Sequence, residues 1–278
     1  MSTLISWAHE TMNFWMGCRK CAPECVHCYI PYGNGFGRRD PWDENGPHLT
    51  KDWRGPCSWQ TRLGESDECA RVFTCSLGDF FDQRVDARGW RDDAWTWIRN
   101  TPNLIWLILT KRPELIADRL PKDWPYQNVW LGVSTGCKST LKKVDILRQI
   151  PMHERAVRFI SAEPLLEDIA DDLDLEGIGW LITGGESGHG DEYLYNPATW
   201  SQRVKRGDDS GRRTMRLEWA KNVMELARFH GVSFWFKQVT APNAGVQPDA
   251  LGQYYYEVPP PPFGTWATKS TRVTKETI

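Results

Sequence analysis

The sequence predicts an α/β protein in which parallel strands form a partial or closed (β/α) barrel. Seven short runs rich in β-branched and aromatic residues alternate with stretches whose apolar residues recur at helical spacing. This alternation is typical of a parallel sheet covered by helices. In chain order the runs are 12–15, 71–75, 104–110, 129–134, 156–161, 180–183 and 232–236, and the helical stretches are 92–100, 113–120, 140–150 and 217–230.

The composition favours an intracellular enzyme. The 278 residues suit one large domain or two small ones, and a hydrophobic content of 40% is enough for a core. A mean hydropathy of −0.55 and the lack of a long apolar run exclude a membrane span. The formal net charge of −2 argues against non-specific coating of nucleic acid, although specific binding stays open. We therefore expect a cytoplasmic protein.

Four cysteines lie close together near the start of the chain, at Cys18, Cys21, Cys25 and Cys28. Counted from Cys21 the spacing is C-x3-C-x2-C, and counted from Cys18 it is C-x6-C-x2-C. Either triple supplies three thiolates to a four-iron, four-sulfur (4Fe-4S) cluster and leaves the fourth iron open to a small molecule. The spacing therefore predicts a cluster bound by Cys25, Cys28 and either Cys18 or Cys21.

Other cysteine chemistries fit this spacing less well. Structural zinc sites usually separate two C-x2-C pairs by a dozen or more residues, whereas only residues 22–24 separate the pairs here. A ferredoxin run has a C-x2-C-x2-C spacing and a partner run, which the sequence lacks. A disulfide is disfavoured because the first residues do not resemble a secretory signal. The remaining cysteines have no metal-ligand spacing and are expected to be buried thiols; they are Cys57, Cys69, Cys75 and Cys137.

Polar residues follow most of the predicted strands, at the end where (β/α) barrels place their sites. One such group alone is most often a turn or a helix cap. Six groups in register with a cysteine loop favour a site instead. The groups are 76–79, 110–112, Ser134, 161–164, 184–188 and 237–238.

Several motifs of the chain occur together in one known family. They are Gly17-Cys18, Cys25-x2-Cys28-Tyr29, Ser76-x2-Asp79-x-Phe81, and the segments 109–113, 128–134, 158–165, 184–188 and 236–238. From about Ser6 to Gln238 the chain resembles the phage-associated, three-cysteine radical-SAM-like proteins of the radical SAM superfamily. The resemblance implies a radical-SAM-type barrel over residues 1–240, with an inserted loop at about 189–212. It matches Cys18, Cys25 and Cys28, whereas the wider superfamily signature selects Cys21, Cys25 and Cys28.

The resemblance also implies the chemistry of a radical SAM enzyme. S-adenosyl-L-methionine would chelate the open iron, and one electron from a reductant such as flavodoxin or ferredoxin would cleave its sulfonium bond. The resulting radical would abstract a hydrogen from the substrate. His27 either stacks on the adenine or is an exposed loop residue. The other candidate contacts are Ser76 and Asp79 for the amino group, Ser134 for the ribose, and Ser161 or Glu163 for the ribose or carboxylate.

Two classes of protein without this catalysis stay open as alternatives. One is an iron–sulfur electron carrier or sensor, and the other is a zinc-stabilised nucleic-acid-binding module. The polar strand ends favour the enzyme, because an electron carrier needs no substrate pocket. The modest net charge disfavours the nucleic-acid module.

The phage association implied by the resemblance predicts a nucleotide or a DNA base as the substrate, which hydrogen abstraction would modify, rearrange or repair. Basic side chains beside aromatic ones hold phosphates and stack on bases, and the inserted loop has this composition. Its four acidic residues make a solvated loop an equal alternative. The candidate substrate residues are Lys111, Arg112, Glu186, Arg203, Lys205, Arg206, Arg213 and Lys237.

Residues 241–278 form a Pro-rich extension that includes four consecutive prolines at 259–262. Such a segment is typical of an extended arm or a packing strap. We expect its last dozen residues to be disordered.

Overall fold

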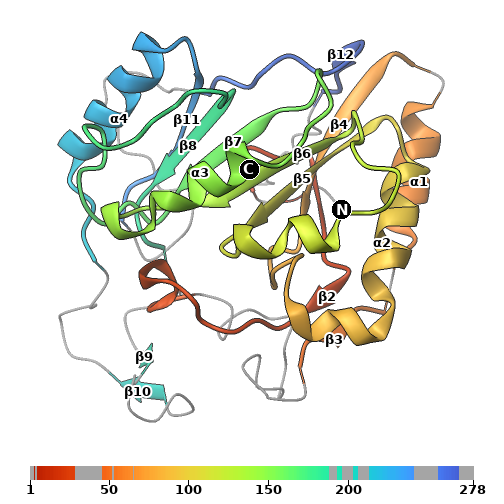
Figure 1. The fold of residues 1–278 in the computed structure, drawn as a ribbon, viewed down its shortest axis with the longest axis horizontal. Coiled ribbons are helices and arrows are strands. Elements are labelled where there is room, and N and C mark those ends of the chain that lie inside the picture. Colours follow the sequence, from red (N-terminus) through yellow and green to blue (C-terminus); the bar gives the residue numbers. More distant parts are fainter. Residues whose placement is uncertain are drawn as a thin grey trace, which may run out of the picture.

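The protein is built on a curled sheet of parallel strands that forms a half-barrel (Figure 1). The computed structural model describes residues 3, 5–28, 46–51, 53–64, 66–187, 213–240 and 256–268, and the backbone of 193–195 and 203–205. The strand order is β1-β4-β5-β6-β7-β8-β11, and every neighbouring pair is parallel. The strands are β1 (Glu10–Met12), β4 (Glu68–Thr74), β5 (Leu104–Thr110), β6 (Val129–Ser134), β7 (Arg158–Ala162), β8 (Trp180–Gly184) and β11 (Ser233–Gln238). The predicted α/β class and partial parallel barrel are confirmed.

The first predicted strand, 12–15, is wrong as a single element. The amide of Cys75 donates to the carbonyl of Met12 at 2.8 Å, and β1 ends there. The side chain of Asn13 then accepts from the amide of Leu77 at 2.9 Å. The chain therefore leaves the parallel sheet, and Trp15–Met16 forms a separate strand, β2, that pairs antiparallel with β3 (His48–Leu49).

Three of the four predicted helical stretches contain α-helices, namely α2 (Trp90–Arg99), α3 (Lys142–Arg148) and α4 (Leu217–Phe229). The stretch 113–120 is instead two 3-10 turns, η4 (Pro113–Leu115) and η5 (Ala117–Arg119), because prolines at 113 and 121 bracket too short a segment. The sequence pattern misses α1 (Gly55–Leu63), which buries few apolar residues. No helix in the described ranges is long and apolar enough to cross a bilayer. Other short elements are η1 (Pro23–Cys25), η3 (Gln83–Arg88), η6 (Lys138–Thr140) and an antiparallel pair, β9 (Tyr193–Tyr195) and β10 (Arg203–Lys205).

The sheet has two differently packed faces. Alternate residues of each strand point to opposite faces, so one set meets the helices and the other lines the concave side. The helix-facing set includes Trp106 and Leu131, which pack with buried residues of the α-helices. The concave set is strongly aromatic and includes Phe73, Trp130, Phe159, Trp180 and Trp235. These rings fill the lower part of the half-barrel.

A C-terminal segment, residues 256–268, joins the two ends of the curled sheet, and we call it the strap. At one end the amide of Glu257 donates to the carbonyl of Phe234 in β11 at 3.0 Å. At the other end β12 (Thr265–Trp266) pairs parallel with the start of β4. The ring of Trp266 lies 5.7 Å from that of Trp130, and the guanidinium of Arg71 covers it at 4.7 Å. The strap therefore closes the floor of the concave side, and the residues after 268 lie outside the described ranges.

Candidate functional site

The four-cysteine loop, residues 17–28, crosses the edge of the sheet at which the parallel strands end (Figure 1). It starts beside the turn after β4, where the amide of Gly17 donates to the carbonyl of Leu77 at 2.9 Å. Gly17 has a φ of 113°, a conformation that favours glycine. A Cβ at Gly78 would lie 3.2 Å from the Gly17 carbonyl oxygen, so a side chain there would crowd the loop. Three buried carboxylates then hold the rest of the loop.

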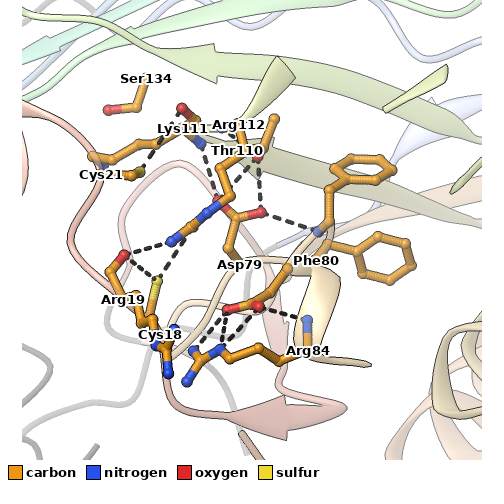
Figure 2. Close-up of polar contacts among 12 residues, drawn as sticks. Cys18, Arg19, Cys21, Asp79, Phe80, Arg84, Thr110, Lys111, Arg112 and Ser134 are labelled. Atoms are coloured by element: carbon orange, nitrogen blue, oxygen red, sulfur yellow. Dashed lines mark hydrogen bonds and ion pairs between the residues drawn. The ribbon is translucent and has the colours of Figure 1, made fainter. Parts of the chain in front are cut away.

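The first carboxylate is Asp79, which holds Arg112 against the start of the loop (Figure 2). Both side chains are buried, and a guanidinium nitrogen of Arg112 donates to Asp79 Oδ2 at 3.0 Å. Thr110, the last residue of β5, donates to Asp79 Oδ1 at 2.8 Å. The same guanidinium reaches the carbonyl of Arg19 and lies 3.5 Å from Cys18 Sγ. Asp79 and Arg112 therefore connect the ends of β4 and β5 to the loop.

The second carboxylate is Glu24, which belongs to the loop itself and points into the protein. Its Oε1 accepts from the amide of Gly136 at 3.0 Å and from Thr140 Oγ1 at 2.7 Å. Its Oε2 lies 3.7 Å from the ammonium of Lys143, which also donates to the carbonyl of Ser134 at 3.1 Å. Burial raises the pKa of Glu24, but the charge of Lys143 and these hydrogen bonds lower it further, so the carboxylate is charged. Glu24 thus ties the loop to the end of β6.

The third carboxylate is Glu186, directly after β8. It pairs with His27 Nδ1 at 2.8 Å, and it accepts from the backbone amide of Arg213 at 2.7 Å and from Arg213 Nε at 3.1 Å. Arg213 also donates to the carbonyl of Pro23 at 2.9 Å. Burial raises the pKa of Glu186, but the hydrogen bonds from His27 and Arg213 outweigh it and bring this pKa to about 2. The end of the loop is therefore fixed to the β8 side of the sheet.

The four thiols of the loop influence one another and two neighbouring cations. Hydrogen bonding from Cys21 lowers the pKa of Cys25 to about 5, with help from the charge of Lys111 and against the effect of burial. The same hydrogen bond, together with burial, raises the pKa of Cys21. Burial raises the pKa of Cys18 to about 12, although Arg112 opposes this. Burial lowers the pKa of Lys111, but the thiols of Cys25 and Cys28 raise it further, so its ammonium stays charged beside them.

The chemistry of this donor set fits an iron–sulfur cluster. The loop carries four free thiols, and cations next to thiols favour the thiolate form that metals bind. Within the described ranges, no three Cys, His, Asp or Glu side chains are already grouped around a point that would hold a metal ion. Binding of a cluster would therefore have to draw the thiols together, while the three carboxylates keep the loop in place.

The predicted cofactor contacts divide into two groups. Ser76 exchanges hydrogen bonds with the side chain of Asn13, and Asp79 is occupied by Arg112 and Thr110, so both have structural partners. Three of the other four lie on neighbouring strand ends. Ser134 and Ser161 face each other in register on β6 and β7, Ser134 Oγ donates to the carbonyl of Glu163, and Glu163 pairs with Lys237 of β11. His27 is bound to Glu186 rather than left as a free loop residue.

The predicted substrate residues do not form one group of free cations. Arg112, Arg213 and Lys237 are each paired with a carboxylate, from Asp79, Glu186 and Glu163 respectively. Lys111 lies among the thiols. The side chains of Arg203 and Lys205, and the whole of Arg206, lie outside the described part of the structure.

Sequence reasoning did not find three residues that hold the loop, namely Glu24, Thr140 and Lys143. A signal for Lys143 is present, because it lies on the buried face of α3 with Val144 and Leu147, and a lysine on such a face needs a partner. Among the other cysteines, Cys69, Cys75 and Cys137 are buried as expected. The expectation for Cys57 is wrong, because it lies on the exposed side of α1.

Comparison with known proteins identifies one family. A family model described as "Protein of unknown function (DUF5131)" matches residues 2–210, which is more than half of the chain. The chain belongs to the DUF5131 family. The DUF5131 match covers the four-cysteine loop and the strands from β1 to β8, and it ends before α4 and β11. The DUF5131 description names no activity, so the resemblance to radical SAM proteins stays a prediction. Neither the curated proteins nor the solved structures gave a match.

Proposed function

We propose that this protein is a radical SAM enzyme whose 4Fe-4S cluster is bound by Cys25, Cys28 and either Cys18 or Cys21. The observation that supports it is the position of the four-cysteine loop, which three buried carboxylates hold over the carboxyl edge of a parallel half-barrel. This edge is where (β/α) proteins place their sites. When bound, the cluster and S-adenosyl-L-methionine supply one-electron cleavage of a sulfonium bond and abstraction of a substrate hydrogen.

The protein's own residues bind and orient the cluster and S-adenosyl-L-methionine and shield them from water. Lys111 and Arg112 stabilise negative charge on the thiolates. Ser134 and Ser161 offer hydroxyls for a ribose, and the Glu163–Lys237 pair offers both charges for the amino and carboxylate groups of the cofactor. The packed aromatic residues of the concave face would keep water from reaching these groups through the floor of the half-barrel. Asp79 holds the loop through Arg112 and Ser76 is bound to Asn13, so the proposal gives neither of them a role toward the cofactor.

The substrate class that we propose to test first is a nucleotide or a DNA base. Its support is the resemblance to phage-associated proteins. The pairing of Arg112, Arg213 and Lys237 with carboxylates adds nothing to that support. A radical acts on whichever carbon–hydrogen bond is held closest to it, so a base in a duplex would have to leave the stack to react.

The first test is the metal content of anaerobically purified protein. We expect iron and sulfide in equal amounts, lost in Cys25→Ala and in Cys28→Ala and retained in Cys57→Ala, which removes an exposed thiol on α1. One of Cys18→Ala and Cys21→Ala should also lose the cluster. Stoichiometric zinc without sulfide would reject the proposal and favour the zinc-stabilised module.

The second test is cleavage of S-adenosyl-L-methionine by dithionite-reduced protein. We expect 5′-deoxyadenosine and methionine as products. A protein that holds a full cluster but neither binds nor cleaves the cofactor would be an electron carrier or sensor. Deuterium transfer into 5′-deoxyadenosine from labelled nucleotides, DNA, peptides or metabolites then identifies the substrate class, and label from a peptide or metabolite alone would reject the nucleic-acid substrate.

A further inference from the structure

Arg112 is held more tightly than a residue that simply balances a charge. Its backbone amide donates to Thr110 Oγ1 at 2.9 Å, and Thr110 in turn donates to both oxygens of Asp79, at 2.8 and 3.0 Å. Asp79 also accepts from the amides of Phe81 at 3.0 Å and Lys111 at 3.1 Å. The carboxylate that orients the guanidinium is therefore itself fixed by three other donors, the Thr110 hydroxyl and the amides of Phe81 and Lys111 (Figure 2).

This arrangement aims the guanidinium at one cysteine. One terminal nitrogen of Arg112 lies 3.0 Å from Asp79 Oδ2 and 3.5 Å from Cys18 Sγ, and the other donates to the carbonyl of Arg19 (Figure 2). Cys18 thus faces a charged N–H donor, and its own thiol donates to the carbonyl of Arg19 at 3.5 Å. Cys21, the alternative third ligand, is exposed, and its sulfur faces the carbonyl oxygen of Lys111 at 4.0 Å, which is an acceptor.

Hydrogen bonds to ligand sulfurs are one of the features by which a protein sets the reduction potential of an iron–sulfur cluster. A donor with a positive charge stabilises the reduced cluster, which carries one more negative charge, more than the oxidised one. Arginine suits this purpose because its guanidinium stays charged and its planar fork binds a carboxylate and a second acceptor together. Exposed charges elsewhere on the protein are screened by solvent and contribute less.

We propose that Arg112, held by Asp79, is a positioning residue that donates a hydrogen bond to the Cys18 thiolate, retains the cluster and raises its reduction potential. The proposal rests on the proposed function, because it requires a cluster in the loop. It adds a role for the Thr110-Lys111-Arg112 segment that no cysteine motif predicts. The hydrogen bond favours reduction of the cluster by one electron. A reductant of the flavodoxin or ferredoxin class supplies that electron.

The experiment compares four variants by cluster content and by the midpoint potential of a redox titration followed by electron paramagnetic resonance. Arg112→Met removes the donor and the charge, Arg112→Lys keeps the charge but not the fork, and Thr110→Val loosens Asp79 without changing any charge. Arg84→Met is the matched control, because it removes the neighbouring ion pair with Asp82, at 2.7 Å, and touches no cysteine (Figure 2).

We expect a lower potential in Arg112→Met, with at least a tenfold smaller ratio of reduced to oxidised cluster at a fixed applied potential, which for one electron is a shift of about 59 mV. Arg112→Lys and Thr110→Val should shift the potential in the same direction by less, and Arg84→Met should match the wild type. Loss of the cluster from Arg112→Met but not from Arg84→Met also supports the proposal. The shift in potential is then measured on Arg112→Lys.

Wild-type potential and wild-type cluster content in Arg112→Met would overturn the proposal and leave the proposed function intact. If Arg112→Met does not fold, an unshifted potential in both Arg112→Lys and Thr110→Val overturns it. Absence of a cluster from the wild-type protein itself would overturn the proposed function together with this inference, so the two failures are distinguishable.

Discussion

Replacing Glu24 with alanine should destabilise the protein strongly, because three donors lose the buried carboxylate that they contact. The carboxylate accepts from Gly136 and Thr140 and pairs with Lys143, whose side chain is only 9% exposed. Removing one partner of a buried ion pair leaves an uncompensated charge and typically costs about 3–5 kcal/mol. Lys143 keeps its bond to the carbonyl of Ser134 at 3.1 Å, so we expect a loss near the lower limit, about 3 kcal/mol.

Urea unfolding of the cluster-free protein at neutral pH measures this loss. Glu24→Gln keeps the size and one acceptor oxygen and should lose less, about 1–2 kcal/mol, because hydrogen bonds to a charged group are stronger than neutral ones. The double variant Glu24→Met with Lys143→Met removes both charges and should recover part of the stability lost by Glu24→Ala. Glu154→Ala is the control, since the side chain of Glu154 is 82% exposed.

The order of these four variants tests the reasoning more sharply than any one value. If Glu24→Ala costs less than about 1 kcal/mol, or no more than Glu154→Ala, then Glu24 does not hold the loop in the way that its contacts indicate. If the double variant is less stable than Glu24→Ala, the unpaired charge of Lys143 is not the main cause of the loss.

Three further predictions concern other parts of the fold. Glu186→Ala should lower the free energy of unfolding by about 3 kcal/mol, because Arg213 loses its buried carboxylate; urea unfolding should show a smaller loss for Glu186→Gln, and an equal loss would contradict the role of charge. Asp82→Asn should flatten the acid side of the stability–pH profile. Burial raises the pKa of Asp82, but the hydrogen bonds and charge of Arg84 lower it further, so its contribution is present above about pH 4, the ordinary pKa, and is lost as the pH falls through the lower folded value. Urea unfolding in acid checks this, and an unchanged slope in the variant would count against it. Trp266→Ala should lower the free energy of unfolding by about 3 kcal/mol, because the strap loses packing. Phe229→Ala changes a side chain that is 86% exposed and should be nearly neutral in the same assay. Similar losses in both variants would contradict the packing role of Trp266.

The strands that the sequence predicts best are the fully buried ones. The runs 104–110 and 129–134 match β5 and β6 to the residue, because each is mainly apolar, ends in a hydroxyl residue and is preceded by an asparagine. The run 12–15 looks similar but contains Asn13, whose side chain binds the backbone of the next turn and takes the chain out of the sheet. The spacing of apolar residues in the sequence does not predict a hydrogen bond between a side chain and the backbone of a distant turn. For the same reason it misses α1, where few apolar residues are buried.

The candidate site was predictable only where its parts are local in sequence. The four cysteines and the polar strand ends can be read from spacing. The carboxylates that hold them cannot, because their partners lie 33, 116 and 159 residues away along the chain. Asp79 illustrates the difference. Its place after a strand predicts a cofactor contact, whereas in the fold its oxygens are occupied by Arg112, Thr110 and two backbone amides.

The strap has a consequence for how the protein avoids aggregation. A half-barrel, unlike a closed barrel, leaves two strand edges whose unpaired backbone groups can recruit strands from other molecules. Residues 256 and 257 pair with β11 at one edge, and β12 pairs with the start of β4, which extends beyond its partner β1 near the other edge. During synthesis and folding the β11 edge stays open until residues 256 and 257 pair with it, and the start of β4 stays open until Thr265 and Trp266 pair with it, so the half-barrel is most vulnerable to self-association before the strap is in place.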